Sequence, residues 1–168
     1  MPELCYYGNP VLRKTAAPVE AFDDDLRALV EGMTEALREA NGVGLAAPQV
    51  GVSKRVAVID TEYGETPPYV LVNPEIIETS EETTVEDEGC LSLPGISLDV
   101  SRPTRVSVRA RNEKGEEYTI KNASGLLAKA LQHEIDHLNG ILFIDHVSAV
   151  QRGLLRGKLK KISAGEFD

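Results

Sequence analysis

The most informative stretch of this 168-residue chain is Gln132-His133-Glu134-Ile135-Asp136-His137, which predicts a metal-binding helix. Its two histidines lie four residues apart, and on a helix this spacing puts both imidazoles on one face, one turn apart. Both rings can then bind one metal ion while Glu134 projects beside them. The chain contains only 3 histidines, so we interpret the spacing as a metal-binding helix rather than as two unrelated surface histidines.

The residues around this stretch predict the helix itself. Apolar side chains recur every three or four residues along one face, as is typical of an amphipathic helix: Leu127, Ala130, Leu131, Ile135 and Leu138. Ser124 is suited to cap the start of this helix, and Gly140 is suited to end it. The imidazoles are therefore expected on a helix that contributes to the core.

Helices are also predicted near both ends of the chain. The segment from Asp23 to Ala40 has the same apolar spacing, with Asp23 as its cap and Gly42 as its end. A last helix is predicted from about Ser148 to Ile162, where two glycines weaken helix formation and leave its ends less defined.

Between these helices, short runs rich in β-branched residues predict antiparallel strands. The predicted fold class is α+β, with antiparallel strands packed around a central metal-bearing helix and with N-terminal and C-terminal helices. No repeat or linker interrupts the pattern, so residues 1–168 are expected to form a single domain. The predicted strands are Arg55 to Ile59, Tyr69 to Val72, Ile76 to Val85, Ser97 to Ser101, Arg105 to Arg111 and Glu117 to Lys121.

Composition narrows the classes of function. A formal net charge of -9 argues against a protein that wraps DNA with its whole surface. The 2 cysteines form no disulfide framework, and neither a secretory signal nor a membrane-length apolar stretch is found, so a cytoplasmic protein without a membrane partner is expected. Residues 152–161 nevertheless contain five basic residues and no acidic one, which fits either a solvated helix face or a local docking patch.

Two imidazoles do not complete a metal site, and Cys90 is the best candidate for the third ligand. It lies in a turn-rich segment between predicted strands, and as a thiolate it would give a Cys-His-His site; a buried inert cysteine is the alternative. Cys5 is expected to be a packed free thiol and His146 a surface or hydrogen-bonded histidine. Three protein ligands leave a position for water, from which Glu134 could accept a proton.

A second unusual segment, Gly42 to Gly51, follows the first predicted helix. Its glycine spacing is not that of a dinucleotide-binding loop, because such a loop follows a strand and precedes a helix. Small residues here let the backbone approach a ligand closely, and Gln49 could donate its amide hydrogens to a developing oxyanion. A tight turn with a satisfied glutamine is the alternative.

Taken together, three segments of this chain resemble the peptide deformylases. Gly42 to Gln49 matches Gly-apolar-Gly-apolar-Ala-Ala-x-Gln, Glu88 to Ser92 matches Glu-Gly-Cys-Leu-Ser, and Gln132 to His137 matches Gln-His-Glu-x-Asp-His. Their order and separations also fit. The resemblance implies a metal-dependent hydrolase that removes the formyl group from the N-terminal formylmethionine of nascent polypeptides.

The resemblance also implies roles for individual residues. Cys90, His133 and His137 would be the metal ligands, and Glu134 the general base and acid. The Gln49 amide and the Leu91 backbone N–H would stabilise the oxyanion. Substrate binding would fall to the Gly44 backbone and to apolar walls that include the His133 ring: Val43, Leu126 and Ala130.

The same resemblance implies a metal and partners. The family metal is ferrous iron, with Zn²⁺, Ni²⁺ or Co²⁺ often found in purified protein. The partners would be N-formylmethionyl peptides and, through basic residues 152–161, the ribosome; a monomer is expected. Glu88 and Arg102 would be partners near the metal loop, with a surface ion pair as the alternative.

Two departures from the family pattern are visible. Residues 96–99 lack an arginine that some members carry there, and Lys129 replaces an apolar residue that is common at its position. Both affect contacts beyond the first substrate residue. A metallopeptidase that cleaves internal bonds and a zinc-stapled binding module are the alternative functions; the first normally takes its third ligand downstream of the helix, and the second requires a fourth protein ligand.

Overall fold

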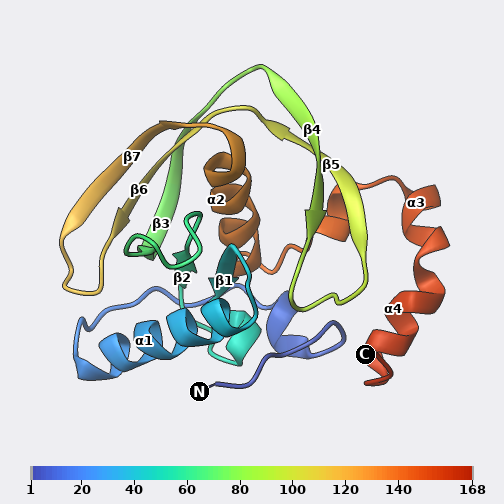
Figure 1. The fold of residues 1–168 in the computed structure, drawn as a ribbon, viewed down its shortest axis with the longest axis horizontal. Coiled ribbons are helices and arrows are strands. Elements are labelled where there is room, and N and C mark those ends of the chain that lie inside the picture. The colour runs from blue at the N-terminus through green and yellow to red at the C-terminus, as the bar shows by residue number, and fades with distance from the viewer. Residues whose placement is uncertain (1, 168) are drawn as a thin grey trace.

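The structure, a computed structural model, describes residues 2–167. These residues form two antiparallel sheets and four α-helices (Figure 1). The larger sheet has the strand order β1-β2-β3-β6-β7, and the smaller one pairs β4 with β5. The strands are β1 (Gly44–Ala46), β2 (Val56–Ile59), β3 (Tyr69–Thr79), β4 (Thr83–Gly89), β5 (Ser97–Pro103), β6 (Val106–Arg111) and β7 (Glu117–Ala123), and the helices are α1 (Asp24–Glu39), α2 (Gly125–Leu138), α3 (Ala149–Leu154) and α4 (Arg156–Ser163).

Helix α2 lies between the two sheets and confirms the predicted central helix (Figure 1). Its apolar side chains pack in one core cluster with residues of β2, β3 and β6. On the other side it is tied to the smaller sheet, because Gln132 Nε2 donates to the Pro103 carbonyl at 3.1 Å. Gly140 has φ +72, a left-handed conformation that ends the helix as predicted. The helix that bears His133 and His137 is thus fixed by core packing on one side and by a hydrogen bond to the smaller sheet on the other.

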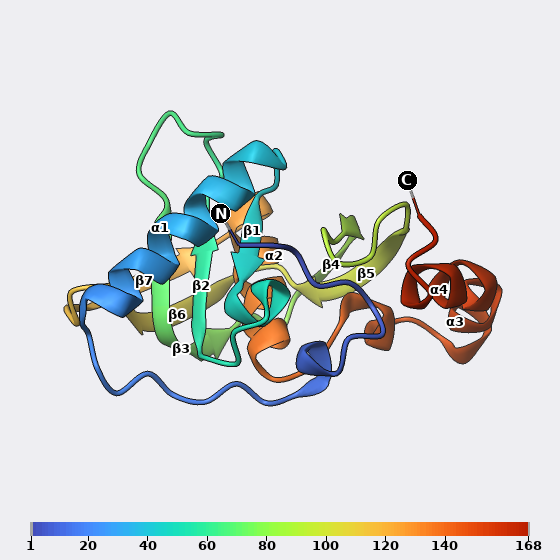
Figure 2. The ribbon, with the colours of Figure 1, turned by 90° about the horizontal axis from the view of Figure 1, so that it is seen from below.

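Helix α1 covers the β1 and β2 end of the larger sheet (Figure 2). Asp23 caps it as predicted, since its carboxylate accepts from Leu26 N at 3.1 Å. The predicted terminator Gly42 is not the residue that turns the chain. Asn41 does so with φ +53, because a short polar side chain tolerates the left-handed region.

The predicted strand from Ile76 to Val85 was wrong, because this segment contains the end of β3, a turn and the start of β4. The predicted break between Val72 and Ile76 was also wrong. β3 continues through residues 73–75, because the Asn73 side chain pairs with both backbone groups of Val19 and fills the irregular register there. The chain then turns at residues 80–82, where Ser80 Oγ donates to the Glu82 carbonyl at 2.8 Å. The turn moves the chain from one sheet to the other, and alternation of residues does not reveal such a change of sheet.

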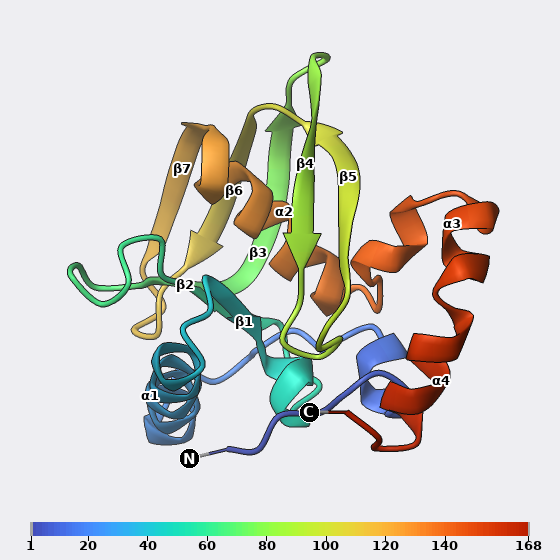
Figure 3. The same ribbon diagram turned by 45° about the vertical axis from the view of Figure 1, so that its right-hand side comes forward.

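Two further elements differ from expectation. Residues 44–46 form strand β1, whose three residues are too few to show a strand period. The single helix predicted at residues 148–162 is divided into α3 and α4 at Leu155 (Figure 3). Helix α3 has no buried residue, so only α4 is held by packing, through Leu159 and Ile162. Within residues 2–167, no helix is long and apolar enough to cross a membrane.

Candidate metal centre

Helix α2 brings the two imidazoles of the central motif together. His133 Nε2 and His137 Nε2 are 3.2 Å apart, and both residues are buried. The ring centroids are 4.9 Å apart, as expected for residues separated by one helical turn. The predicted arrangement of the helix motif is therefore present.

Cys90 joins these histidines from a different part of the chain. It follows the end of β4, and its Sγ lies 3.3 Å from His137 Nε2. The ligand atoms of Cys90, His133 and His137 all lie within 4.8 Å of one another. Tetrahedral coordination with bonds of about 2.0–2.3 Å separates donor atoms by roughly 3.3–3.6 Å, close to the distances found here. The three residues are therefore arranged to bind a metal ion.

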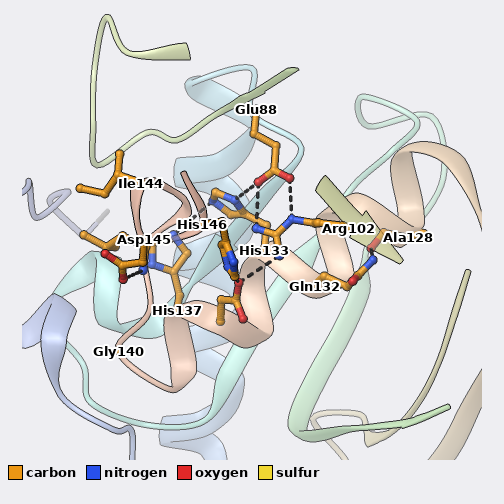
Figure 4. Close-up of polar contacts among 12 residues, drawn as sticks. Glu88, Arg102, Ala128, Gln132, His133, His137, Gly140, Ile144, Asp145 and His146 are labelled. Carbon is orange, nitrogen blue, oxygen red and sulfur yellow. Dashed lines mark hydrogen bonds and ion pairs between the residues drawn. The ribbon is translucent and has the colours of Figure 1, made fainter. Parts of the chain in front are cut away.

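A chain of charged groups holds the His133 ring in place (Figure 4). His133 Nδ1 is 3.0 Å from Glu88 Oε1, and Arg102 binds the same carboxylate with Nε at 2.5 Å and Nη2 at 2.9 Å. Arg102 Nη1 also donates to Asp136 at 3.0 Å, and Asp136 contacts His146 Nε2 at 2.8 Å. With Nδ1 directed at a carboxylate, His133 presents Nε2 to the metal position.

Glu88 and Arg102 form a buried pair rather than the surface pair considered as an alternative. Their side chains are 3% and 7% exposed. Burial alone would raise the pKa of Glu88, but the hydrogen bonds from His133 and Arg102 outweigh it and lower the pKa to about 2. The carboxylate therefore stays charged beside the imidazole.

Glu134 lies next to the three donor atoms and is nearly free of partners. It is 3% exposed, and its Oε1 is buried without a hydrogen-bond partner among residues 2–167. Burial raises its pKa to about 7, against the opposing charge of His133. A Cβ on Gly44 would lie 2.5 Å from Glu134 Oε2, so only glycine leaves room for this carboxylate.

Gln49 is fixed with its amide nitrogen directed at the site. Its Oε1 accepts from Ala46 N at 2.9 Å, while Nε2 donates to Ser92 Oγ at 3.1 Å and to Cys90 Sγ at 3.5 Å. The short 3-10 helix Ala47–Val50, which follows β1, holds the backbone of Gln49. The side chain is satisfied, as one alternative required, and it also points into the site.

A pocket of about 420 Å³ opens beside these residues. Its walls include Val43, Gly44, Leu126 and Ala130, together with Gln49, Cys90, Leu91, His133 and Glu134. Every predicted site residue except His137 therefore lines one pocket, and His137 lies directly behind it through its contact with Cys90.

Known proteins of similar sequence and fold identify the family. Residues 1–153 match the model of the polypeptide deformylase family. A peptide deformylase of Thermotoga petrophila is 49% identical over 157 residues, which are 94% of this chain and 93% of that protein. The chain belongs to the peptide deformylase family.

Further relatives agree with this assignment. A peptide deformylase of Acidobacterium capsulatum is 49% identical over 164 residues, covering 96% of this chain and 95% of that protein. The crystal structure of a peptide deformylase from Legionella pneumophila superimposes with a TM-score of 0.92 at 43% identity, covering 99% of this chain and 97% of that one. The chain is thus a metallohydrolase of this family, and these relatives do not support a metallopeptidase or a binding module.

The remaining sequence predictions can be placed around the deformylase site. His146 is hydrogen-bonded as predicted, because its Nε2 contacts Asp136, which also accepts from Arg102. Cys5 and Cys90 are both free thiols. The sequence alone did not predict that Gly89 lines the pocket, and the only signal for Lys129 was its departure from the family pattern.

Proposed function

We propose that this deformylase acts on N-formylmethionyl peptides with one divalent ion held by Cys90, His133 and His137. The observation that carries the proposal is the convergence of these three donor atoms beside a buried carboxylate with an unpartnered oxygen. Such an ion supplies a Lewis acid and lowers the pKa of a water in the open position. The substrate is a linear amide whose hydrolysis releases formate.

Glu134 moves the proton in this proposal. A carboxylate with a pKa of about 7 can both accept a proton from the attacking water and return it to the leaving amine near neutral pH. Gly44 leaves Glu134 the space to do so, and the Glu134 side chain is itself only 3% exposed.

Gln49 and Leu91 stabilise the oxyanion. The Gln49 amide nitrogen lies 3.5 Å from Cys90 Sγ, and the hydrogen that it directs to this sulfur is the one that would turn to the formyl oxygen as negative charge develops there. Leu91 follows the ligand Cys90 directly and lines the same pocket, and its backbone N–H is the second donor of the proposal.

The substrate backbone binds along β1. Asp60 N donates to the Val43 carbonyl at 2.7 Å. Because backbone bonding alternates along an antiparallel strand, the backbone groups of Val43 and Leu45 face β2. The N–H and C=O of Gly44 therefore point to the free edge of β1. That edge borders the pocket. An extended peptide can pair with Gly44 there, and its methionine side chain enters the space between Val43, Leu126, Ala130 and the His133 ring.

Ferrous iron is the native metal in this proposal. Zn²⁺, Ni²⁺ and Co²⁺ fit the same ligands, and affinity order favours most of them over iron, so handling determines occupancy. A thiolate ligand is open to oxidation. Protein purified without oxygen is expected to contain iron and to lose activity in air, whereas full activity after exposure to air would contradict an iron site.

The basic residues 152–161 are proposed to dock on the ribosome, with the chain acting in the cytoplasm as a monomeric single domain. Arg156, Lys158 and Lys160 are exposed, which supports an electrostatic contact with nucleic acid. Replacing all three with glutamate is expected to weaken ribosome co-sedimentation markedly. Unchanged co-sedimentation would remove the ribosome from the proposal.

The function is tested by formate release from formyl-Met-Ala-Ser with protein purified without oxygen. Glu134→Gln is the matched variant, since it keeps the shape of the side chain and removes its proton-accepting charge; its metal content is checked by elemental analysis. Release by the parent and loss in the metal-loaded variant are expected. No release by iron-loaded parent protein would overturn the proposal.

A further inference from the structure

The second wall of the pocket is also a free strand edge, at β4. Thr104 N donates to the Glu82 carbonyl at 2.9 Å, just before the first pair of the β4–β5 ladder. Hydrogen-bonded pairs in an antiparallel ladder recur every second residue. Asp87 and Gly89 are therefore unbonded to β5, and their backbone groups point away from it, toward the pocket that Gly89 lines.

Lys129 of α2 occupies part of this edge. Its Nζ donates to the Asp87 carbonyl at 2.9 Å, and its side chain is only 26% exposed. The carboxylate of Glu86 lies 3.9 Å from Nζ, too far for a hydrogen bond. An ammonium group has three N–H donors, so two of them are left for other partners. Among the described residues that line the pocket, Lys129 is the only lysine or arginine.

The ammonium group lies at a defined distance from the metal position. Gly89 directly precedes the ligand Cys90, and Asp87 is two residues further from it along β4. Strands advance about 3.3 Å per residue, so a peptide with its formyl group at the metal and its first residue beside Gly89 brings its third residue beside Asp87. At that point the Asp87 carbonyl already accepts from Lys129. The remaining N–H donors of Lys129 can bond only to an acceptor, and the main-chain carbonyl oxygen of the third substrate residue is one.

We propose that Lys129 is a specificity-determining residue that donates a charged hydrogen bond to the main-chain carbonyl oxygen of the third substrate residue. The inference rests on the proposed function of the site and extends it beyond the formylmethionyl residue. It makes the chain a deformylase that distinguishes substrates by length, because a formyl dipeptide has no third residue and therefore lacks the carbonyl that Lys129 would bind.

The test compares formyl-Met-Ala-amide with formyl-Met-Ala-Ser-amide, whose blocked ends exclude a contact with a terminal carboxylate. Lys129→Met keeps most of the side-chain volume and removes the donors. The parent is expected to prefer the longer peptide. In the variant kcat/KM for the longer peptide should fall about tenfold, as loss of a charged hydrogen bond predicts, with the change in KM rather than kcat. The shorter peptide should be unaffected.

Lys121→Met is the matched control, since Lys121 is an exposed lysine of β7 outside the pocket. It should leave both peptides unchanged. Equal losses of kcat/KM for both peptides in Lys129→Met would indicate a structural role and would overturn the inference. A gain for the longer peptide would also overturn it, because it would mean that Lys129 blocks the strand edge. Failure of the proposed function would instead abolish formate release from both peptides by the parent protein. Alongside either of those outcomes in the variant, formate release from the dipeptide by the parent therefore shows that only the inference about Lys129 has failed.

Discussion

At the scale of single residues, the site depends on a missing side chain as much as on those present. The space that Glu134 occupies exists because position 44 is glycine. The imidazole of His133 is oriented because Glu88 and Arg102 are buried together beside it. Each of these contacts gives a prediction for one substitution.

Gly44→Ala is expected to lower kcat/KM at least about tenfold with little change in fold. The added Cβ would lie 2.5 Å from Glu134 Oε2, so the carboxylate must move, and small displacements of a catalytic group slow the reaction strongly. Formate release and circular dichroism check this. Gly153→Ala is the control, because its Cβ would meet nothing within 4 Å; it should leave activity intact, and equal rates for both variants would contradict the prediction.

Glu88 makes stability depend on acidity. Its folded-state pKa is about 2, against a model value of 4.5, so between these values the unfolded chain binds a proton that the folded chain does not. Stability from Glu88 is thus complete above about pH 5 and is lost as the pH falls toward 2. Urea unfolding from pH 6 to 2.5 should show a steeper decline for the parent than for Glu88→Gln; parallel curves would exclude this role of Glu88.

At the scale of elements, the C-terminal helices differ in how they are held. Helix α4 buries Leu159 in a cluster with Leu12 and Phe143, while α3 buries nothing and leaves Leu154 81% exposed. The break between them therefore separates a packed helix from a solvated one.

Leu159→Ala is expected to lower the free energy of unfolding by about 2–5 kcal/mol, the range for removing a buried leucine side chain. Leu154→Ala removes the same atoms from an exposed site and should change stability by less than about 0.5 kcal/mol. Urea denaturation of both variants measures the difference. Similar values for the two would mean that α4 is not anchored by this cluster.

At the scale of the whole molecule, the metal position joins three parts of the chain. The ligands come from α2 and from the segment after β4, and Gln49 comes from the segment after β1. A bound ion would therefore link the central helix to the segment that follows β4 of the smaller sheet.

Removal of metal by a chelator is expected to abolish formate release and lower the thermal unfolding temperature. A ligand that binds only the folded state stabilises it, by about 2.7 kcal/mol when present at 100 times its Kd. Calorimetry before and after chelation measures this. Restoration of both properties by Fe²⁺, Ni²⁺ or Co²⁺ is the control, and an unchanged unfolding temperature would contradict a link between the ion and the fold.

The sequence by itself determined the local features of this protein. The spacing of His133 and His137, the helix that bears them and the Asp23 cap follow from helix geometry, which depends only on residues a few positions apart. The three motifs also predicted the family, which was confirmed. Within the site, the sequence predicted the three residues that the structure arranges to bind a metal ion: Cys90, His133 and His137.

Only the tertiary structure decided how separate segments meet. The contact of Cys90 with His137, the burial of Glu88 against Arg102, the division of the strands into two sheets and the bond from Lys129 to Asp87 join residues far apart in the chain. Such contacts depend on how the sheets and helices pack, and a charged residue in a sequence does not reveal that it will be buried, because most charged side chains lie in solvent. Periodicity describes one element at a time, so it cannot specify which edge of β4 faces α2.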